Sequence, residues 1–303
     1  MTPRKGESRE QYLQRERENW RRRTKAFRSE QLAESTTRDA PLPAPAVEIP
    51  VINVPEHGLT VALVLDAQVK HGVPIDHLRA YGRYIAAHRP DVVLCIGDFA
   101  DMRSLNRHDL PGSKKREGQR YWKDIEATRR GMDALMVPIV RESGYDPMRI
   151  MLYGNHEDLI PRYVDANPVM DETLSLDNLG YADYGWKCVP FLQPIVIGGV
   201  AFCHYFPAGI MGRPITRADQ LLTQMGMSCV AGHQQGRQIA WARRADGGER
   251  CAIISGSFYQ HDEDYMSPLA NRHWRGTYFL HEVKDGSFAE MALTVNYLLR
   301  KWK

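Results

Sequence analysis

The chain has 303 residues, a formal net charge of +3, and 43% hydrophobic and 25% charged residues, which is the balance of a globular protein with a sizeable core. This net charge is close to zero, which excludes a strongly basic composition. A polyanionic partner would therefore have to be recognised by local charge. No apolar run reaches the roughly 18 residues that a membrane span needs, and the first residues lack the apolar core of a secretory signal. We therefore expect a cytoplasmic protein with no membrane partner, whose oligomeric state the sequence leaves open.

The cysteines give the same indication of compartment. No two of the five are at CxxC spacing, and most lie in apolar runs such as VVLCIG and GVAFCH. This pattern favours buried free thiols in a reducing compartment over disulfides, and it argues against a zinc-thiolate site.

The first 58 residues are predicted to precede the folded domain. Residues 1–40 read as a charged N-terminal helical extension, because they hold many basic residues and too few apolar ones for a core. The basic cluster at residues 21–25 could hold phosphates, or it could belong to a solvated helix with charge pairs such as Glu18 and Arg22. Residues 41–58 contain five prolines, which predicts an extended linker. The folded domain then covers residues 59–303.

From residue 59 the pattern alternates between strands and helices. Buried strands are predicted over residues 60–65, 91–96 and 149–153, and helices over 74–88 and about 118–142. Strand–helix–strand order with continuously apolar strands predicts a parallel sheet covered on both faces. After residue 185 the predicted strands follow one another closely, over residues 191–197, 200–204, 228–231, 238–243, 251–255 and 278–283. The fold class is therefore α/β, with a mainly β second half that forms a second sheet packed on the first.

Polar side chains follow five of these strands at the point where each strand ends. They are Asp66-Ala67-Gln68, Gly97-Asp98, Gly154-Asn155-His156-Glu157, His204, and Gly232-His233-Gln234-Gln235. The carboxyl ends of parallel strands face one crevice, so these side chains are expected to converge. Carboxylate, amide oxygen and imidazole are ligands for hard to borderline divalent ions. A bridging aspartate can hold two such ions, and a hydroxide that they activate can attack phosphorus in line.

The order of these motifs resembles the signature of the calcineurin-like metallophosphoesterases, which reads D-x-(H), GD, GNH(D/E), H and GH-x-(H). The resemblance covers roughly residues 60–260, and Gly154-Asn155-His156-Glu157 is its most specific element. It implies a two-sheet α/β sandwich and identifies residues 59–303 as a metallophosphoesterase domain. The turn Ile254-Ser255-Gly256-Ser257 also resembles one that follows the last metal motif in this family.

The resemblance further implies a role for each motif residue. One metal ion would take Asp66, Gln68, Asp98 and Gln235. The other would take Asp98, Asn155, His204 and His233, so that Asp98 bridges the two ions. His156 would lie beside the scissile phosphate, where it stabilises charge and assists the leaving oxygen. Asp98 and His156 are therefore the predicted catalytic residues.

The chain departs from the family pattern at two positions of the same metal site. The family usually has histidine at positions 68 and 235, and here both are glutamine. An amide oxygen is a poorer ligand for zinc than for Mg²⁺ or Mn²⁺. We therefore expect two divalent ions with Mn²⁺ or Mg²⁺ favoured over Zn²⁺ or Fe, or a first site that fills only with substrate. Similar glutamine-bearing variants occur in bacteriophage-type members of the family, and a second-shell or idle role for Gln68 and Gln235 stays open.

Several residues near the motifs have two interpretations. Asp101 could support a metal-binding residue or cap the next helix, and His71 and His108 could approach the substrate or simply be polar surface residues.

The stretch from Arg103 to Arg130 is basic and contains Tyr121 and Trp122. Basic residues interleaved with aromatic ones can follow a nucleic-acid backbone and stack bases. A solvated helix would have the same composition. Arg103 and Arg107 are the predicted substrate-binding residues.

The sequence thus predicts a divalent-metal-dependent phosphoesterase. The favoured substrate is nucleic acid, cleaved as by a phosphodiesterase or nuclease. One alternative is a phosphatase or phosphodiesterase of a small nucleotide or a phosphoprotein, because the motifs define the metal site and not the leaving group. A second alternative is a nucleic-acid-binding protein of the same fold that has lost most turnover through its two glutamines.

Overall fold

The computed structural model describes residues 52–106, 112, 114–264 and 266–303. The predicted helical extension over residues 1–40, most of the predicted linker, and the residues Arg107 and His108 lie outside the described residues. Residues 52–58 form no helix or strand, and the first strand begins at Leu59.

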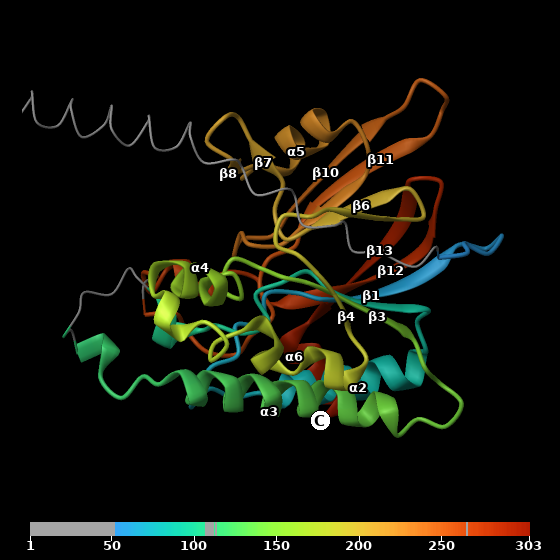
Figure 1. The fold of residues 1–303 in the computed structure, drawn as a ribbon. Coiled ribbons are helices and arrows are strands. Elements are labelled where there is room, and N and C mark those ends of the chain that lie inside the picture. Colours follow the sequence, from blue (N-terminus) through green and yellow to red (C-terminus); the bar gives the residue numbers. More distant parts are fainter. Residues whose placement is uncertain (1–51, 107–111, 113, 265) are drawn as a thin grey trace, which may run out of the picture. The chain divides into compact units, whose positions relative to one another are not determined.

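The larger sheet has six strands in the order β13-β12-β1-β2-β3-β4 (Figure 1). Its parallel strands are β1 (Leu59–Val64), β2 (Val92–Cys95), β3 (Met148–Leu152) and β4 (Lys187–Val189). Two antiparallel strands, β12 (Gly276–Lys284) and β13 (Ser287–Thr294), extend the sheet beyond β1. All four residues of β2 are buried, as expected of a parallel strand that is covered on both faces.

The second sheet has five strands in the order β10-β11-β9-β6-β5. They are β5 (Ile195–Ile197), β6 (Val200–Cys203), β9 (Cys229–Ala231), β10 (Gln238–Arg243) and β11 (Glu249–Ile254). Its three central strands β6, β9 and β11 run parallel, and the outer strands β5 and β10 run antiparallel to their neighbours. A short hairpin of β7 (Pro207–Ala208) and β8 (Arg213–Pro214) follows β6.

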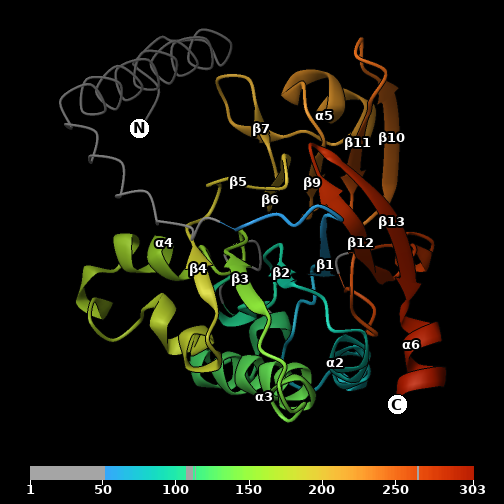
Figure 2. The same cartoon turned by 90° about the vertical axis from the view of Figure 1, so that its right-hand side faces the viewer.

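Helices cover the outer faces of both sheets. The helices α2 (Asp76–His88), α3 (Tyr121–Val140) and α6 (Val295–Trp302) lie against the larger sheet, and α2 packs on both of the others (Figures 1 and 2). The helix α5 (Ala218–Met225) packs on β9, β10 and β11, and α4 (Leu159–Ala166) follows β3. The short 3₁₀ helices are η1 (Arg103–Leu105), η2 (Lys114–Arg116), η3 (Pro168–Met170), η4 (Leu176–Leu179), η5 (Tyr181–Tyr184) and η6 (Ala270–Arg272).

Two hydrophobic clusters hold these layers together. The larger one fills the space between the two sheets and beneath α2 and α3, and the smaller one lies between the second sheet and α5. The strand β11 contributes to both, because successive side chains of a strand point to opposite faces. Cys251 and Ile253 belong to the larger cluster, whereas Ala252 and Ile254 belong to the cluster under α5.

The predicted α/β fold with two packed sheets is confirmed. The predicted strand over residues 191–197 is wrong at its start, because Gln193 N–H donates to Pro190 O in a tight turn and β5 begins only at Ile195. The prediction of a mainly β second half missed α5 and α6. All five cysteines are free, as predicted, and four of them are buried. Within the described part of the chain, no helix combines the length and apolarity that crossing a membrane requires.

Candidate metal centre

The predicted site residues lie at the carboxyl ends of strands from both sheets. Asp66, Asp98 and Asn155 follow β1, β2 and β3, which are parallel neighbours in the larger sheet. His204 and His233 follow β6 and β9, which are parallel neighbours in the second sheet. The site therefore forms where the carboxyl ends of the two parallel sets meet, as an α/β architecture favours.

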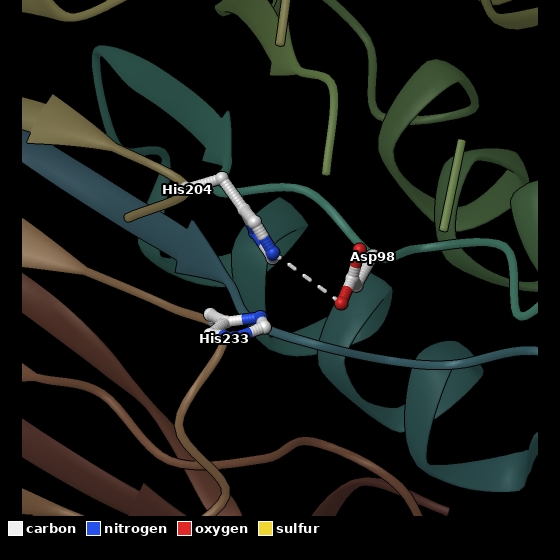
Figure 3. Close-up of side chains that lie close together, drawn as sticks. All are labelled: Asp98, His204 and His233. Carbon is white, nitrogen blue, oxygen red and sulfur yellow. Dashed lines mark ion pairs between the residues drawn. The ribbon is translucent and has the colours of Figure 1, made fainter. Parts of the chain in front are cut away.

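Three of these side chains point at one another (Figure 3). One ligand atom each from Asp98, His204 and His233 lies within 4.8 Å of the other two. Asn155 joins them, because its Oδ1 atom is 2.9 Å from His204 Nε2 and 2.7 Å from His233 Nδ1. Ligands about 2.1 Å from one ion are separated by about 3 Å or more, so these four side chains can share a cation.

The tautomer of His204 makes this grouping chemically informative. His204 Nδ1 lies 2.9 Å from the Ile96 carbonyl oxygen, which can only accept, so Nδ1 carries the proton. In the neutral ring, Nε2 then presents a lone pair to Asn155 Oδ1 and, at 3.4 Å, to Asp98 Oδ2. Three acceptors that face one another in a buried site favour a positive charge among them, either a proton or a metal ion.

The titration of these groups follows from burial and from the same charges. Burial lowers the pKa of His204, but the Asp98 carboxylate outweighs it and raises that pKa to about 9. Burial raises the pKa of Asp98, and the neighbouring His204 and His156 together bring it well below its usual range. His233 differs, because burial and the His204 charge lower its pKa to about 4. It therefore offers a neutral ring nitrogen near pH 7, as a metal ligand must.

The oxygens predicted to hold the other metal ion have only some of the hydrogen bonds that they could accept. Asp66 Oδ1 accepts from the His233 backbone N–H at 3.2 Å. Asp66 Oδ2 and Gln68 Oε1 are buried and have no hydrogen-bond partner among the described residues. Burial raises the pKa of Asp66 to about 8, with the Asp98 charge as a further cause and His204 opposing it. Orphaned buried oxygens of this kind are what a bound cation would satisfy.

Gln235 stands apart from this group. Its Oε1 atom accepts a hydrogen bond from the Tyr259 hydroxyl at 2.8 Å. Tyr259 is buried, and no sequence motif identified it as part of the site. An amide oxygen has a second lone pair, so the contact with Tyr259 orients the Gln235 amide without using up its capacity to bind a cation.

Close backbone approach explains two of the motif glycines. Gly97 has φ +98°, and a Cβ there would lie 2.8 Å from His204 Nδ1. A Cβ on Gly154 would lie 2.1 Å from Asp98 Oδ1, where no atom fits. Gly97 thus has a backbone conformation that glycine adopts readily, whereas Gly154 is required because Asp98 packs directly on its backbone.

The backbone itself is strained at this centre. Gln68, Asp98 and His233 have φ values of +41°, +51° and +66°, and only nine non-glycine residues of the described chain have positive φ. Each such residue costs about 1–3 kcal/mol and persists only where the surroundings impose it. Three of them coincide with predicted metal ligands, which indicates that the fold holds these side chains for a purpose other than stability.

Glu157 fixes the loop that carries Asp98. Its carboxylate is fully buried and accepts from the backbone N–H groups of Asp98 at 3.0 Å, Ala100 at 3.0 Å and Gly154 at 2.9 Å. It also accepts from the Tyr181 hydroxyl at 3.1 Å. The sequence motif contained Glu157 but assigned it no role, and nothing in the sequence pointed to Tyr181.

His156 lies at the edge of this centre and is held by Asp101. Its Nδ1 atom is 2.6 Å from the Asp101 backbone oxygen and 3.0 Å from Asp101 Oδ1. Its Nε2 atom faces Asp98 Oδ2 at 3.8 Å. Burial lowers the pKa of His156, but the Asp98 charge and the Asp101 contacts raise it well above its usual range. Of the two interpretations of Asp101, support of a site residue is the one that its contacts fit.

The remaining predicted residues fall outside this cluster or outside the described chain. Arg103 lies in η1, directly after the Asp98 loop, and its guanidinium pairs with Asp264 at 2.8 Å. Arg107 lies outside the described residues. His71 is exposed, which is the ordinary surface interpretation.

Comparison with known proteins adds little to this geometry. No protein-family model and no curated protein matches the chain. One of the solved structures that match is the crystal structure of a dimetal phosphatase from Danio rerio, which is 12% identical. The match covers 78% of this chain and 96% of that chain, with a TM-score of 0.37. At this level of likeness, the activity has to be argued from the site itself.

Proposed function

We propose that this chain is a divalent-metal-dependent phosphoric ester hydrolase of the calcineurin-like kind. The observation that carries the proposal is the convergence of Asn155 Oδ1, His204 Nε2, His233 Nδ1 and Asp98 Oδ2 in one buried site. Such a set of oxygens and imidazole nitrogens suits a divalent ion. The orphaned oxygens of Asp66 and Gln68 support a second ion beside it.

The two ions would be held as the motifs predict. Asp98, Asn155, His204 and His233 would hold one ion; Asp66, Gln68, Asp98 and Gln235 would hold the other. Two divalent ions at such a centre supply charge stabilisation for a phosphoryl group and a nucleophile derived from water. The oxygen-rich donor set around Asp66 favours Mn²⁺ or Mg²⁺.

His156 would carry the proton for the leaving oxygen. The Nδ1 atom of His156 contacts Asp101, so Nε2 is the nitrogen that faces the site. A cation that neutralises Asp98 would remove one cause of the raised His156 pKa, but the Asp101 contacts would remain, because Asp101 is not among the predicted ligands. A proton at Nε2 is therefore available to the oxygen that departs from phosphorus.

For the substrate we propose a phosphodiester that carries nucleobases, such as a nucleic-acid strand. Phe191 and Tyr205 form an edge-to-face pair at 5.5 Å, and the Tyr205 ring lies 4.9 Å from that of His233. The Arg162 guanidinium lies 5.9 Å from the Phe191 ring centre. Partly exposed aromatic rings with a guanidinium beside a phosphate-processing site suit a base next to the scissile bond.

A second basic and aromatic patch supports the same substrate class. Trp122 in the first turn of α3 is 60% exposed, and Lys123 Nζ lies 5.7 Å from its ring. The Ser104 backbone N–H donates to Asp124 Oδ2, which ties this turn to η1 beside the Asp98 loop. A strand bound at the metal centre could continue towards this patch, whereas a small nucleotide or a phosphoprotein side chain would make no use of it.

The test is hydrolysis by the purified chain with Mn²⁺, Mg²⁺ or Zn²⁺ after chelation. The substrates are single-stranded DNA, bis-p-nitrophenyl phosphate and p-nitrophenyl phosphate. We expect turnover of the two diesters with Mn²⁺ or Mg²⁺, and loss of at least about 100-fold in Asn155→Ala and His156→Ala. His57→Ala, at an exposed turn, is the matched control.

Other outcomes favour the alternatives. Preference for p-nitrophenyl phosphate or a free nucleotide would indicate a small-molecule phosphatase. Tight DNA binding without turnover in any metal would indicate a binding protein. Unchanged turnover in both Asn155→Ala and His156→Ala would show that this centre is not the active site.

A further inference from the structure

A buried lysine lies behind the predicted catalytic histidine. Lys70 is in the loop that follows Asp66 and Gln68, and only 9% of its side chain is exposed. Its ammonium group contacts Glu263 Oε1 at 2.6 Å, Glu263 Oε2 at 2.8 Å and Asp101 Oδ2 at 3.1 Å. Three carboxylate oxygens thus surround an ammonium group that has three protons to donate.

The contacts of Asp101 connect this lysine to His156. One Asp101 carboxylate oxygen, Oδ2, contacts the Lys70 ammonium, and the other, Oδ1, lies 3.0 Å from His156 Nδ1, which also lies 2.6 Å from the Asp101 backbone oxygen. The lysine therefore determines how the Asp101 carboxylate is turned, and that orientation determines which oxygen reaches the imidazole. Burial raises the pKa of Asp101, but His156 and Lys70 together lower it to about 2, so the carboxylate is charged when it holds His156.

Glu263 anchors the lysine from a distant part of the chain. It is 193 residues away in sequence and 3% exposed. Its backbone N–H donates to Asn271 Oδ1 at 2.9 Å and its carbonyl accepts from Asn271 Nδ2 at 3.0 Å. His261 Nε2 contacts its carboxylate at 2.7 Å. These contacts with His261 and Asn271 hold the Glu263 carboxylate against Lys70.

Stability alone is a poor reason for this arrangement. Taking charges out of water costs several kcal/mol per ion, and well-packed apolar residues at the same place are often as stable or more so. Buried charged groups that are retained next to a reacting centre commonly orient it. Through Asp101, this cluster reaches His156, which has a predicted chemical role.

We propose that Lys70, anchored by Glu263, is a positioning residue for the acid that protonates the leaving oxygen. The proposal rests on the proposed function. During the step, the water-derived oxygen forms its bond to phosphorus while the bond to the leaving oxygen breaks. The proton on His156 Nε2 moves to that leaving oxygen, and Asp101 keeps the ring aligned because Lys70 holds its second oxygen.

The first test uses two esters of thymidine 5′-monophosphate, one with p-nitrophenol and one with phenol. They bind through the same nucleotide and differ in how basic the leaving phenolate is. Loss of a well-placed acid slows the ester with the more basic leaving group far more, because p-nitrophenolate departs without a proton. A merely structural defect would slow both esters alike.

The informative variant is the double substitution Lys70→Met with Glu263→Gln. It removes the ammonium without leaving a buried Glu263 charge unpaired, so it is expected to fold, and thermal unfolding checks that. Glu263→Gln alone is the matched control, because Lys70 keeps its contact with Asp101. Lys70→Arg tests rescue by a conserved charge.

We expect the double variant to lower kcat for the phenyl ester by about 10–100-fold and for the p-nitrophenyl ester by less than about threefold. KM should stay within about twofold for both. Glu263→Gln should lose much less of the phenyl-ester rate than the double variant does, because its amide oxygen still accepts from Lys70, and Lys70→Arg should recover most of that rate. Equal losses on the two esters, or no loss on the phenyl ester, would overturn the proposal.

A second readout does not depend on activity. In the metal-free protein, the Nδ1–H proton of His156, which faces the Asp101 backbone oxygen at 2.6 Å and the Asp101 carboxylate at 3.0 Å, should give a downfield proton resonance, assigned by its loss in His156→Gln. We expect it to persist in Glu263→Gln and to move or broaden in the double variant; an unchanged resonance there would overturn the positioning role. If the unsubstituted chain hydrolyses no ester with any metal, the proposed function fails, and this resonance alone decides whether Lys70 positions His156.

Discussion

The Nε2 atom of His204 lies 2.9 Å from the Oδ1 atom of Asn155, and neither atom has a proton to offer when the ring is neutral. The same nitrogen faces Asp98 Oδ2 at 3.4 Å. Without a cation, the Asp98 carboxylate favours a proton on this ring and, against the effect of burial, raises the pKa of His204. A divalent ion would remove the conflict more completely, because it contacts all the acceptors at once.

Divalent metal should therefore stabilise the fold. At a free Mn²⁺ concentration about 100-fold above its Kd, the free energy of unfolding should rise by about 2.7 kcal/mol. Thermal unfolding after chelation, with and without added Mn²⁺, measures this. His233→Ala should lose most of the effect, because it removes a neutral imidazole from the centre, whereas His57→Ala should keep it. An equal Mn²⁺ effect in both variants would contradict the predicted centre.

Glu157 should be the most sensitive residue for the loop that carries Asp98. In Glu157→Gln one of the two oxygens becomes an NH₂ group, which would face backbone N–H donors that need an acceptor. The expected loss is about 2–4 kcal/mol of the free energy of unfolding, measured by urea denaturation. Tyr181→Phe removes only the 3.1 Å hydroxyl contact and should cost about 1 kcal/mol. Similar losses in the two variants would show that Glu157 does not organise the loop.

Gly154→Ala should weaken metal binding. The added methyl group would meet Asp98 Oδ1 at 2.1 Å and the Asp98 backbone nitrogen at 2.3 Å, so both the carboxylate and the loop that carries it have to move. We expect Mn²⁺ affinity, measured by isothermal titration calorimetry, to fall by about 10-fold or more. Gly236→Ala is the control, because its Cβ would enter open space and its φ is not positive. Unaltered affinity in Gly154→Ala would mean that Asp98 does not hold the ion.

His77 should make the fold sensitive to acid. Burial lowers the pKa of this side chain to about 4, against about 6.5 in an unfolded chain. Between these values the unfolded state binds a proton that the folded state does not, so stability is full above about pH 6.5 and falls as the pH drops towards 4. Between pH 8 and pH 5 the loss should be about 2 kcal/mol.

The pH effect is isolated by comparison with His77→Gln in chelator. Other groups titrate in both proteins, so the difference between the two pH profiles of the free energy of unfolding belongs to His77. The variant should be less sensitive to acid than the unsubstituted chain over this range. Parallel profiles would show that His77 is not held neutral.

Much of the site could be predicted from the sequence, because its polar residues directly follow strands. Asp66, Asp98 and Asn155 each follow an apolar strand, and the rule that parallel strands end at one edge brings them together without knowledge of any side-chain contact. The same rule applied to His204 and His233. The predicted strand that began at Phe191 was wrong because a tight turn at Pro190, with Leu192 at φ +62°, occupies its first residues. Apolar composition alone does not distinguish such a turn from a strand.

What the sequence determined by itself is the alternation of strands and helices from Leu59 to Leu152 and the polar residues that end the strands, because both depend on neighbours in the chain. Only the tertiary structure decided that Tyr259 holds Gln235, that Glu157 binds the backbone of the Asp98 loop, and that Lys70 meets a carboxylate 193 residues away. Hydrogen bonds and ion pairs of this kind depend on distances of about 3 Å between segments remote in sequence. No periodicity or motif encodes those distances, since they result from how the two sheets pack.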